Sequence, residues 1–452
     1  MYKRASVLWS FLVLATGVTA QDVLDGYIRE GLQNNLVLKE KKIGLEKSML
    51  ALREAKSLFL PTTWFETQYT LAQGGRSFDI PVGDLMNPVY KTLNQLTGTN
   101  QFPQISNVSE QFLPNNFYDV RIKTTMPVIH PEIRISRDIK VQEIGLQENE
   151  VEIYKRELVK EIKSAYYQYL AASQSIRIFQ NAEEVVNQNL KVNQSLLQQG
   201  KGLYAYVSRA ESEVQSVNSQ LATAVNQQRN AQAYFNFLLN RSLDEPVQQA
   251  DYEMDAALLQ SISLADSIRV SAREELKSLA LAQDINRNVL KMNRSFRTPR
   301  LNTFVDLAAQ GFDFRVNNKS FFYLAGLQLQ IPIFTGKRNL YHIQQTEWDM
   351  KNLELQASQT EKQLALAAFV SRNNAWNAYN NFQSSGKQQE SARQYFKLID
   401  RGYKEGVNSF IEWLDARNQL TTAQLQATIH TYQFLSALAD YERQTATYSF
   451  NQ

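Results

Sequence analysis

The chain has 452 residues and no cysteine, and its 48 lysines and arginines nearly balance its 45 acidic residues. This length could form several domains, and the lack of cysteine excludes disulfides and a lipid-modified N-terminal cysteine. A near-neutral chain without a basic block gives no sign of a nucleic acid or another polyanion as partner.

Residues 1–20 have the pattern of a signal peptide. Lys3 and Arg4 precede an apolar stretch at 7–18, and Val-Thr-Ala at 18–20 resembles a cleavage site. The apolar stretch is too short to span a bilayer, which leaves an uncleaved N-terminal anchor as the alternative. The mature protein is therefore expected to be exported.

The next segments predict one helix, two strands and two long helices. Apolar residues recur at helical spacing until Pro61 and then alternate with polar ones, which marks the change from helix to strand. This first structural repeat, residues 21–240, is expected to contain a helix at 23–58, strands at 62–71 and 118–127, and long helices at 132–172 and 180–240.

The same order of elements is expected again in residues 241–452. A heptad seam runs from Val207 to Leu238 in steps of three and four, and a second seam runs from Trp413 to Gln444, 206 positions later. Two such seams indicate an internal duplication. The second repeat is expected to contain a helix at 262–294, strands at 300–310 and 321–332, and long helices at 337–382 and 387–448.

The four strands are each about ten residues long, which suits a tilted crossing of a bilayer. An ordinary two-layer sheet is the alternative, but export and the aromatic residues near the strand ends favour a membrane barrel. Val120, Ile122, Leu327 and Leu329 are then expected to face lipid. The polar residues of the opposite phase are candidates for the barrel lumen: Glu66, Gln68, Asp119, Arg121, Lys123, Asn302, Asp306, Gln328 and Gln330.

Four strands cannot close a barrel, and an open edge in lipid leaves backbone groups unpaired at a cost of several kcal/mol each. The barrel must therefore be shared between copies of the chain. Two copies would supply eight strands and a filled interior, whereas three would supply twelve and leave room for a lumen. Residues 72–117, between the first two strands, have no clear period and are expected to form a long surface loop or a lid over the pore.

Three stretches carry a resemblance to a known family. They are Pro-Val-Ile-His-Pro at 127–131, Pro-Ile-Phe-Thr-Gly at 332–336, and the segment 402–420, from Gly-Tyr-Lys-Glu-Gly to Arg-Asn-Gln-Leu. With the duplicated plan, they make the chain similar to the TolC-type outer-membrane efflux family. The resemblance implies a mixed α and β membrane protein, a homotrimer with one 12-stranded β-barrel in the outer membrane that continues as a long α-helical coiled-coil barrel in the periplasm.

The resemblance also implies a function and partners. The protein would be the passive exit duct of a tripartite efflux or type I secretion system, gated at its periplasmic helix tips and engaged by a periplasmic adaptor and an inner-membrane pump. The polar turns expected near 173–181 and 382–387 lack the acidic ring that such tips often carry. The candidate gate residues are Gln174, Arg177, Gln180, Asn181, Asn381, Gln383 and Lys387.

No enzyme or cofactor is expected. The three histidines, His130, His342 and His430, are far apart, and no motif of a metalloprotease, a serine hydrolase or a phosphate-binding loop occurs. Two other functions stay open: a periplasmic coiled-coil adaptor and a structural protein of an export complex. Neither alternative explains four amphipathic strands of membrane-spanning length.

Overall fold

The computed structural model describes residues 20–250 and 270–450. The chain divides into a helical unit, residues 1–49, 142–286 and 348–452, and a sheet unit, residues 50–141 and 287–347. Residues 1–19 of the signal peptide expected at 1–20, and the first residues of the helix expected at 262–294, lie outside the described residues.

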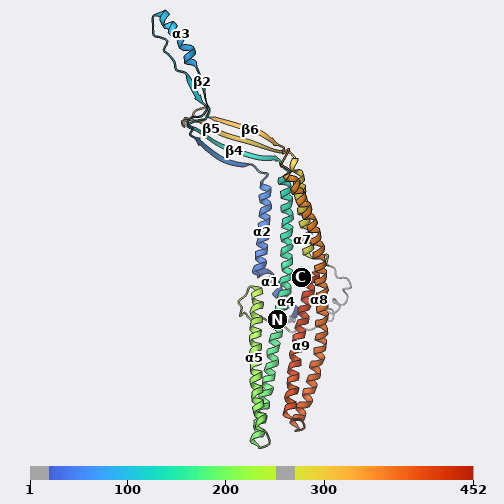
Figure 1. Cartoon of the computed structure of the whole chain (residues 1–452). Coiled ribbons are helices and arrows are strands. Elements are labelled where there is room, and N and C mark those ends of the chain that lie inside the picture. The colour runs from blue at the N-terminus through green and yellow to red at the C-terminus, as the bar shows by residue number, and fades with distance from the viewer. Residues whose placement is uncertain (1–19, 251–269, 451–452) are drawn as a thin grey trace, which may run out of the picture. The chain divides into compact units, whose positions relative to one another are not determined.

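The sheet unit contains one four-stranded antiparallel sheet, in the order β1-β4-β5-β6 (Figure 1). Its strands begin and end within two residues of the ranges expected from the alternating pattern. They are β1 (Thr62–Thr70), β4 (Phe117–Ile129), β5 (Arg300–Phe312) and β6 (Phe321–Gln330).

The segment between β1 and β4 is more ordered than the loop expected at 72–117. It contains a two-stranded sheet of β2 (Ser77–Ile80) and β3 (Val108–Gln111), and the helix α3 (Val82–Thr97) between them. Gly98 ends α3 in the left-handed conformation. Pro88 lies inside the helix, and such a residue favours a loop prediction because proline removes a helical hydrogen bond.

The long helices of the helical unit are paired and repeat with a nearly constant offset. The first pair is α4 (Pro131–Gln198) and α5 (Tyr204–Leu239), and the second is α8 (Arg338–Lys404) and α9 (Phe410–Thr445). Both α5 and α9 have 36 residues, and each ends at a left-handed cap residue. The duplicated helix-strand-strand-helix-helix plan thus extends to the ends of individual helices.

The turns expected at 173–181 and 382–387 are wrong, because α4 and α8 continue through both segments. The true turns contain Gly200 and Gly406, with φ of 69° and 79°, a conformation that costs glycine nothing. Each glycine therefore follows the end of a helix and does not mark a local break within a longer one. Polar residues such as Gln174 and Asn181 lie on the exposed side of a continuous helix and do not interrupt it.

The two turns have the same hydrogen bonds. Gly200 N donates to Leu197 O at 2.9 Å and Gly406 N donates to Tyr403 O at 3.1 Å, while the next residue in each turn donates to the carbonyl five positions before it. This is the Schellman arrangement, which satisfies the last carbonyls of a helix. The second turn adds a capping box, in which Ser409 and Glu412 bond each other's backbone N–H at the start of α9.

The helix expected at 23–58 is two helices, α1 (Ala20–Asn34) and α2 (Leu36–Ser57), separated by Asn35. The buried Asn35 side chain accepts from Leu38 N at 3.0 Å, as an N-cap does, and donates to Leu238 O at 2.9 Å. Another helix, α7 (Glu274–Arg294), leads towards β5. A buried asparagine that caps one helix and bonds another does not interrupt the helical spacing of the apolar residues. The boundary between α1 and α2 was therefore not visible in the sequence pattern.

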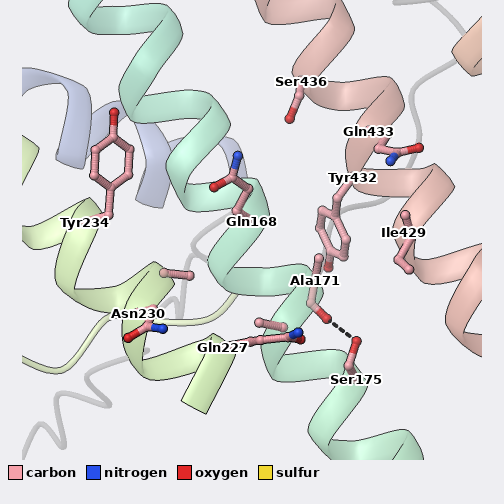
Figure 2. A pocket seen from close by; sticks show the side chains of 12 residues that line it. Gln168, Ala171, Ser175, Gln227, Asn230, Tyr234, Ile429, Tyr432, Gln433 and Ser436 are labelled. Carbon is pink, nitrogen blue, oxygen red and sulfur yellow. Dashed lines mark hydrogen bonds between the residues drawn. The ribbon is translucent and has the colours of Figure 1, made fainter. Parts of the chain in front are cut away.

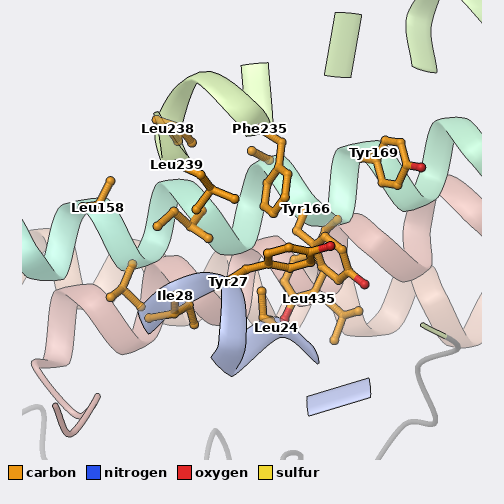
Figure 3. Close-up of a cluster of buried hydrophobic side chains, with 14 of the residues drawn as sticks. Leu24, Tyr27, Ile28, Leu158, Tyr166, Tyr169, Phe235, Leu238, Leu239 and Leu435 are labelled. Atoms are coloured by element: carbon orange, nitrogen blue, oxygen red, sulfur yellow. The ribbon is translucent and has the colours of Figure 1, made fainter. Parts of the chain in front are cut away.

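The core of the helical unit is formed by α1, α4, α5, α8 and α9, together with Leu38 of α2 (Figure 3). Tyr27 meets Phe235 edge-on, with ring centroids 5.0 Å apart, and Tyr166 packs beside both. Phe235 and Tyr166 are fully buried. Every residue of both heptad seams is buried or half-buried, which agrees with their expected role in helix packing.

Candidate functional site

The nine polar residues predicted for a barrel lumen lie on one face of the sheet. In an antiparallel pair, directly opposed residues share a face. Glu66 is opposite Arg121, and Lys123 is opposite Asp306. Gln68–Asp119 and Asn302–Gln328 are further opposed pairs, and Gln330 lies two residues from Gln328 on the same strand. That this face lines a lumen stays a prediction.

Charges on this polar face balance one another. The Arg121 guanidinium forms an ion pair with Asp119 and lies 3.9 Å from the Asp306 carboxylate. Lys123 is opposite the same Asp306. The face therefore offers hydrogen-bonding groups of both signs to water, without a dominant charge.

The opposite face of the sheet is apolar and uncovered. One row across the four strands consists of Phe65, Ile122, Leu307 and Tyr323, with exposed fractions between 46% and 78%. A soluble sheet would bury such a row, because large exposed apolar patches mark a surface that contacts protein or lipid.

Both outer strands of the sheet have a free edge. Each of β1 and β6 pairs on one side only, within the described residues. Three successive antiparallel pairings make β6 run opposite to β1. The β6 edge of one copy can therefore pair antiparallel with the β1 edge of another.

The seven residues predicted for a gate lie on the sides of α4 and α8. All of them are exposed, and none lies in the turns that the structure shows: Gln174, Arg177, Gln180, Asn181, Asn381, Gln383 and Lys387. Arg177 donates to Gln249 Oε1 at 3.0 Å, in the segment that follows α5. At about 1.5 Å per residue, Arg177 lies roughly 35 Å along α4 from Gly200.

A buried ion pair joins the two helix pairs near their turns. Arg417 of α9 donates to Glu213 of α5, and their side chains are only 4% and 13% exposed. Burial lowers the pKa of Arg417 below its ordinary value, despite the attraction to Glu213. Arg417 Nε has no hydrogen-bond partner among the described residues. The pair is therefore held in a poorly solvated position.

Aromatic and polar side chains surround a hollow of about 860 Å³ between the same two turns. Trp413 Nε1 donates to Asp400 at 2.9 Å, and Tyr403 Oη donates to Asn193 Oδ1 at 3.4 Å. Burial would raise the pKa of Asp400, but hydrogen bonds from Lys404 and Trp413 outweigh it and leave the pKa below its ordinary value. The Tyr403–Asn193 contact, from α8 to α4, is a second link between the two helix pairs.

These contacts near the turns were not predicted, although the sequence contains a signal for one of them. Glu213 precedes the seam residue Val214, and Arg417 follows the seam residue Ala416. Oppositely charged residues that flank two seams are the usual interhelical salt bridges of a coiled coil. The pairing of α5 with α9 could have been inferred from them.

A second hollow, of about 650 Å³, lies between α4, α5 and α9 and has no charged residue among those that line it (Figure 2). Gln168, Gln227 and Asn230 contribute amides, and Tyr234 and Tyr432 contribute rings. No cluster of metal-ligating side chains occurs in residues 20–250 and 270–450. Among those residues, no helix is both long and apolar enough to cross a membrane.

The comparisons with known proteins agree with this geometry. Residues 269–443 match the family described as "Outer membrane efflux protein". A comparison with curated protein sequences found no match.

Three solved structures share the fold. The CmeC outer membrane channel of Campylobacter jejuni is 13% identical with a TM-score of 0.72, over 94% of this chain and 85% of its own. The outer membrane protein VceC of Vibrio cholerae is 13% identical with a TM-score of 0.71, over 93% and 95%. The Neisseria gonorrhoeae MtrE outer membrane channel, in its open state, is 14% identical with a TM-score of 0.70, over 94% and 88%.

The chain thus has the fold of these outer-membrane channels, and its residues 269–443 are similar to the outer-membrane efflux proteins. The expected resemblance to the TolC-type family is confirmed by the family match and by the fold. The matched family and the three structures are outer-membrane proteins, and the expected location of this chain, in the outer membrane and extending into the periplasm, agrees with them.

Proposed function

We propose that the chain is the outer-membrane exit duct of a tripartite efflux or type I secretion system, and that it acts as a passive trimeric channel. The two free sheet edges carry this proposal, because β1 and β6 run in opposite directions and neither can remain unpaired in lipid. Three copies joined edge to edge close a barrel of twelve strands. Its apolar face then contacts lipid and its polar face lines the duct.

The trimer and the duct are tested together on the purified protein. A heat-labile trimer should appear on a denaturing gel without boiling, and the same preparation should conduct ions in a planar bilayer. A monomer in detergent that conducts nothing would contradict the proposal, because four strands cannot enclose a lumen.

We further propose that the duct is gated where the α4–α5 and α8–α9 pairs meet near their turns. The Arg417–Glu213 ion pair and the Tyr403–Asn193 contact join the two pairs, so that opening requires both to separate. A hydrogen bond to a charged group contributes about 1.5–3 kcal/mol, and threefold symmetry repeats each contact three times. Moving a gate from mostly closed to mostly open needs about 5.5 kcal/mol, which these contacts can supply.

The gate is tested with Tyr403→Phe, which removes one contact and keeps the aromatic ring. The single-channel conductance of the closed state should rise in this variant. Tyr395→Phe, on the same helix and outside the link to α4, is the control. Equal conductance in both variants would remove the Tyr403–Asn193 contact from the gate.

The partners in this proposal are a periplasmic adaptor and an inner-membrane pump. Large apolar side chains are exposed at both turns, namely Leu203, Tyr204, Val407 and Ile411. Exposed apolar groups beside polar ones suit a transient protein contact. Photo-crosslinkers at Val407 and at Gln419, an exposed control position on α9, should differ in their capture of the adaptor in whole cells. Equal capture at both positions would contradict a docking site at the turns.

A further inference from the structure

The helix α3 carries a short heptad seam that the described chain covers only in part, at Val82 and Leu93. Val82, Met86, Val89, Leu93 and Leu96 follow one another in steps of four and three. Met86, Val89 and Leu96 are exposed, and Leu96 is 79% exposed. A 4-3-4-3 spacing presents one narrow apolar stripe, which is typical of a helix that packs against another helix.

The other side of α3 is already occupied by the segment that returns to β3. Asn87 exchanges two hydrogen bonds with the backbone of Ile105, both 2.9 Å long, and Asn94 exchanges two with the backbone of Phe102, at 2.8 and 3.1 Å. Asn107 forms two more with Asp84, one to its backbone N–H and one to its carboxylate. These contacts fix the rotation of α3, so that the seam faces away from its own hairpin.

These six hydrogen bonds are needed because α3 is a weak helix by itself. It has 16 residues, which is marginal for an isolated helix, and Pro88 in its interior costs about 3 kcal/mol. The tight approach of the returning segment is visible at Gly83, where an added Cβ would lie 2.4 Å from Ile105 O. A weak helix held in one orientation by six polar contacts indicates that the orientation of the seam matters.

The amino-acid composition of α3 favours contact with another protein helix over contact with a lipid surface. Helices that lie on membranes carry lysine and arginine on the polar face, whereas α3 has one of each charge, Asp84 and Lys91.

The seam residues also suit more than two helices. In the seam, Met86 and Leu93 take the a positions, and Val82, Val89 and Leu96 take the d positions. Dimers favour β-branched residues at a with leucine at d, whereas the reversed order shifts the preference to three or more strands. The insertion that carries α3 begins at the end of β1, whose free edge is proposed to pair with another copy.

We propose that the occupant of this seam is the same helix of the other copies, so that three α3 helices form a short parallel bundle. Cyclic symmetry makes the helices parallel, and assembly of the barrel holds them at a high effective concentration. The inference rests on the proposed trimer and adds a second interface to it, outside the barrel.

Single cysteines test this bundle directly, because the natural chain has none. Leu96→Cys and Val89→Cys place a thiol on the seam, and Lys91→Cys places one on the opposite side of α3. After mild oxidation of the purified trimer, both seam variants should give several-fold more disulfide-linked pairs than Lys91→Cys. Adding Leu96→Asp to Val89→Cys should lower its crosslinking and leave the heat-labile trimer intact.

The outcomes separate the two proposals. Equal crosslinking in the seam and control variants, with the heat-labile trimer present, would overturn the bundle alone. Absence of the trimer in the unsubstituted protein would overturn both. A fluorophore on the thiol of the Leu96→Cys variant that is quenched by nitroxide-labelled phosphatidylcholine vesicles, without crosslinking, would assign the seam to lipid and also overturn the bundle.

Discussion

Replacing Glu213 by glutamine should leave the Arg417 charge buried without its partner. Arg417 is 4% exposed, and its Nε already lacks a hydrogen-bond partner among the described residues. Breaking a buried ion pair from one side costs about 3–5 kcal/mol, and the partial exposure of Glu213 favours the lower figure. With an unfolding entropy of about 2 cal/mol/K per residue, about 3 kcal/mol corresponds to roughly 3 °C in Tm.

The assay is thermal unfolding of the purified protein, followed by the helical circular dichroism signal. Glu405→Gln is the control at the same turn, because the Arg401–Glu405 side chains are 80% and 57% exposed and such pairs contribute at most about 0.5 kcal/mol. The double variant Glu213→Leu with Arg417→Met removes both charges and should recover most of the loss. Equal Tm values for Glu213→Gln and Glu405→Gln, or a double variant as unstable as Glu213→Gln, would refute the reasoning.

Three further predictions concern the sheet, the core and acid stability. Ile122→Arg places a charge in the apolar row and should cost about 2–4 kcal/mol, lowering the trimer yield in membranes, while Thr125→Arg on the other face should be tolerated; equal yields would contradict the assigned faces. Phe235→Ala empties a fully buried position and should cost about 3–5 kcal/mol in unfolding experiments, whereas the 65% exposed Phe237 should accept alanine with little loss. Burial by itself would raise the pKa of Glu157 and Glu275, but nearby cations outweigh burial and lower both pKa values. Lys160 and Arg443 act on Glu157, and Arg273 and Arg443 act on Glu275. The two carboxylates contribute fully to the free energy of unfolding above their unfolded pKa of about 4.5, and this contribution is lost as pH falls through their lower folded pKa values. When the pH is lowered below about 4.5, Tm should therefore decrease, and it should decrease less in Glu275→Gln.

The strands of the sheet were predictable from the sequence because one face of the sheet is polar and the other is apolar. Alternation of period two is strong in β4, where Val120 and Ile122 alternate with Arg121 and Lys123. A shift of one residue would exchange the faces, so the pattern determines the register as well as the strand. The heptad seams were predictable for the same reason, since their burial follows from spacing alone.

The turns between the long helices were predicted at the wrong positions because the predicted and the observed positions are equally consistent with the internal duplication. Moving from Arg177 to Gln383 spans 206 residues, and moving from Gly200 to Gly406 spans 206 residues as well. Polar stretches rich in glutamine and serine occur on the exposed side of long helices and do not end them. Glycine at a left-handed position is the stronger signal, because it satisfies the last carbonyls of the helix.

The order within 72–117 had no local signal of this kind. Helix α3 depends on side chains that bond a backbone several residues away, as Asn87 does with Ile105 and Asn94 does with Phe102. Prolines and glycines dominate any interpretation of such a segment, while asparagine is common in loops and helices alike. Only the spacing of Val82, Val89 and Leu96 would have suggested a helix.

The corrected turns change which residues a gate can use. Arg177 bonds Gln249 beyond the end of α5, so this side chain fastens the chain that follows α5 to α4. The links between the two helix pairs nearest the turns are instead a buried ion pair, a tyrosine–asparagine contact and a cluster of aromatic rings that includes Phe410 and Trp413. Separating the two helix pairs would hydrate the Arg417 charge and expose the rings together. A gate built on these contacts would open in one step, whereas exposed residues such as Gln174 and Lys387, already in contact with water, would bias neither state.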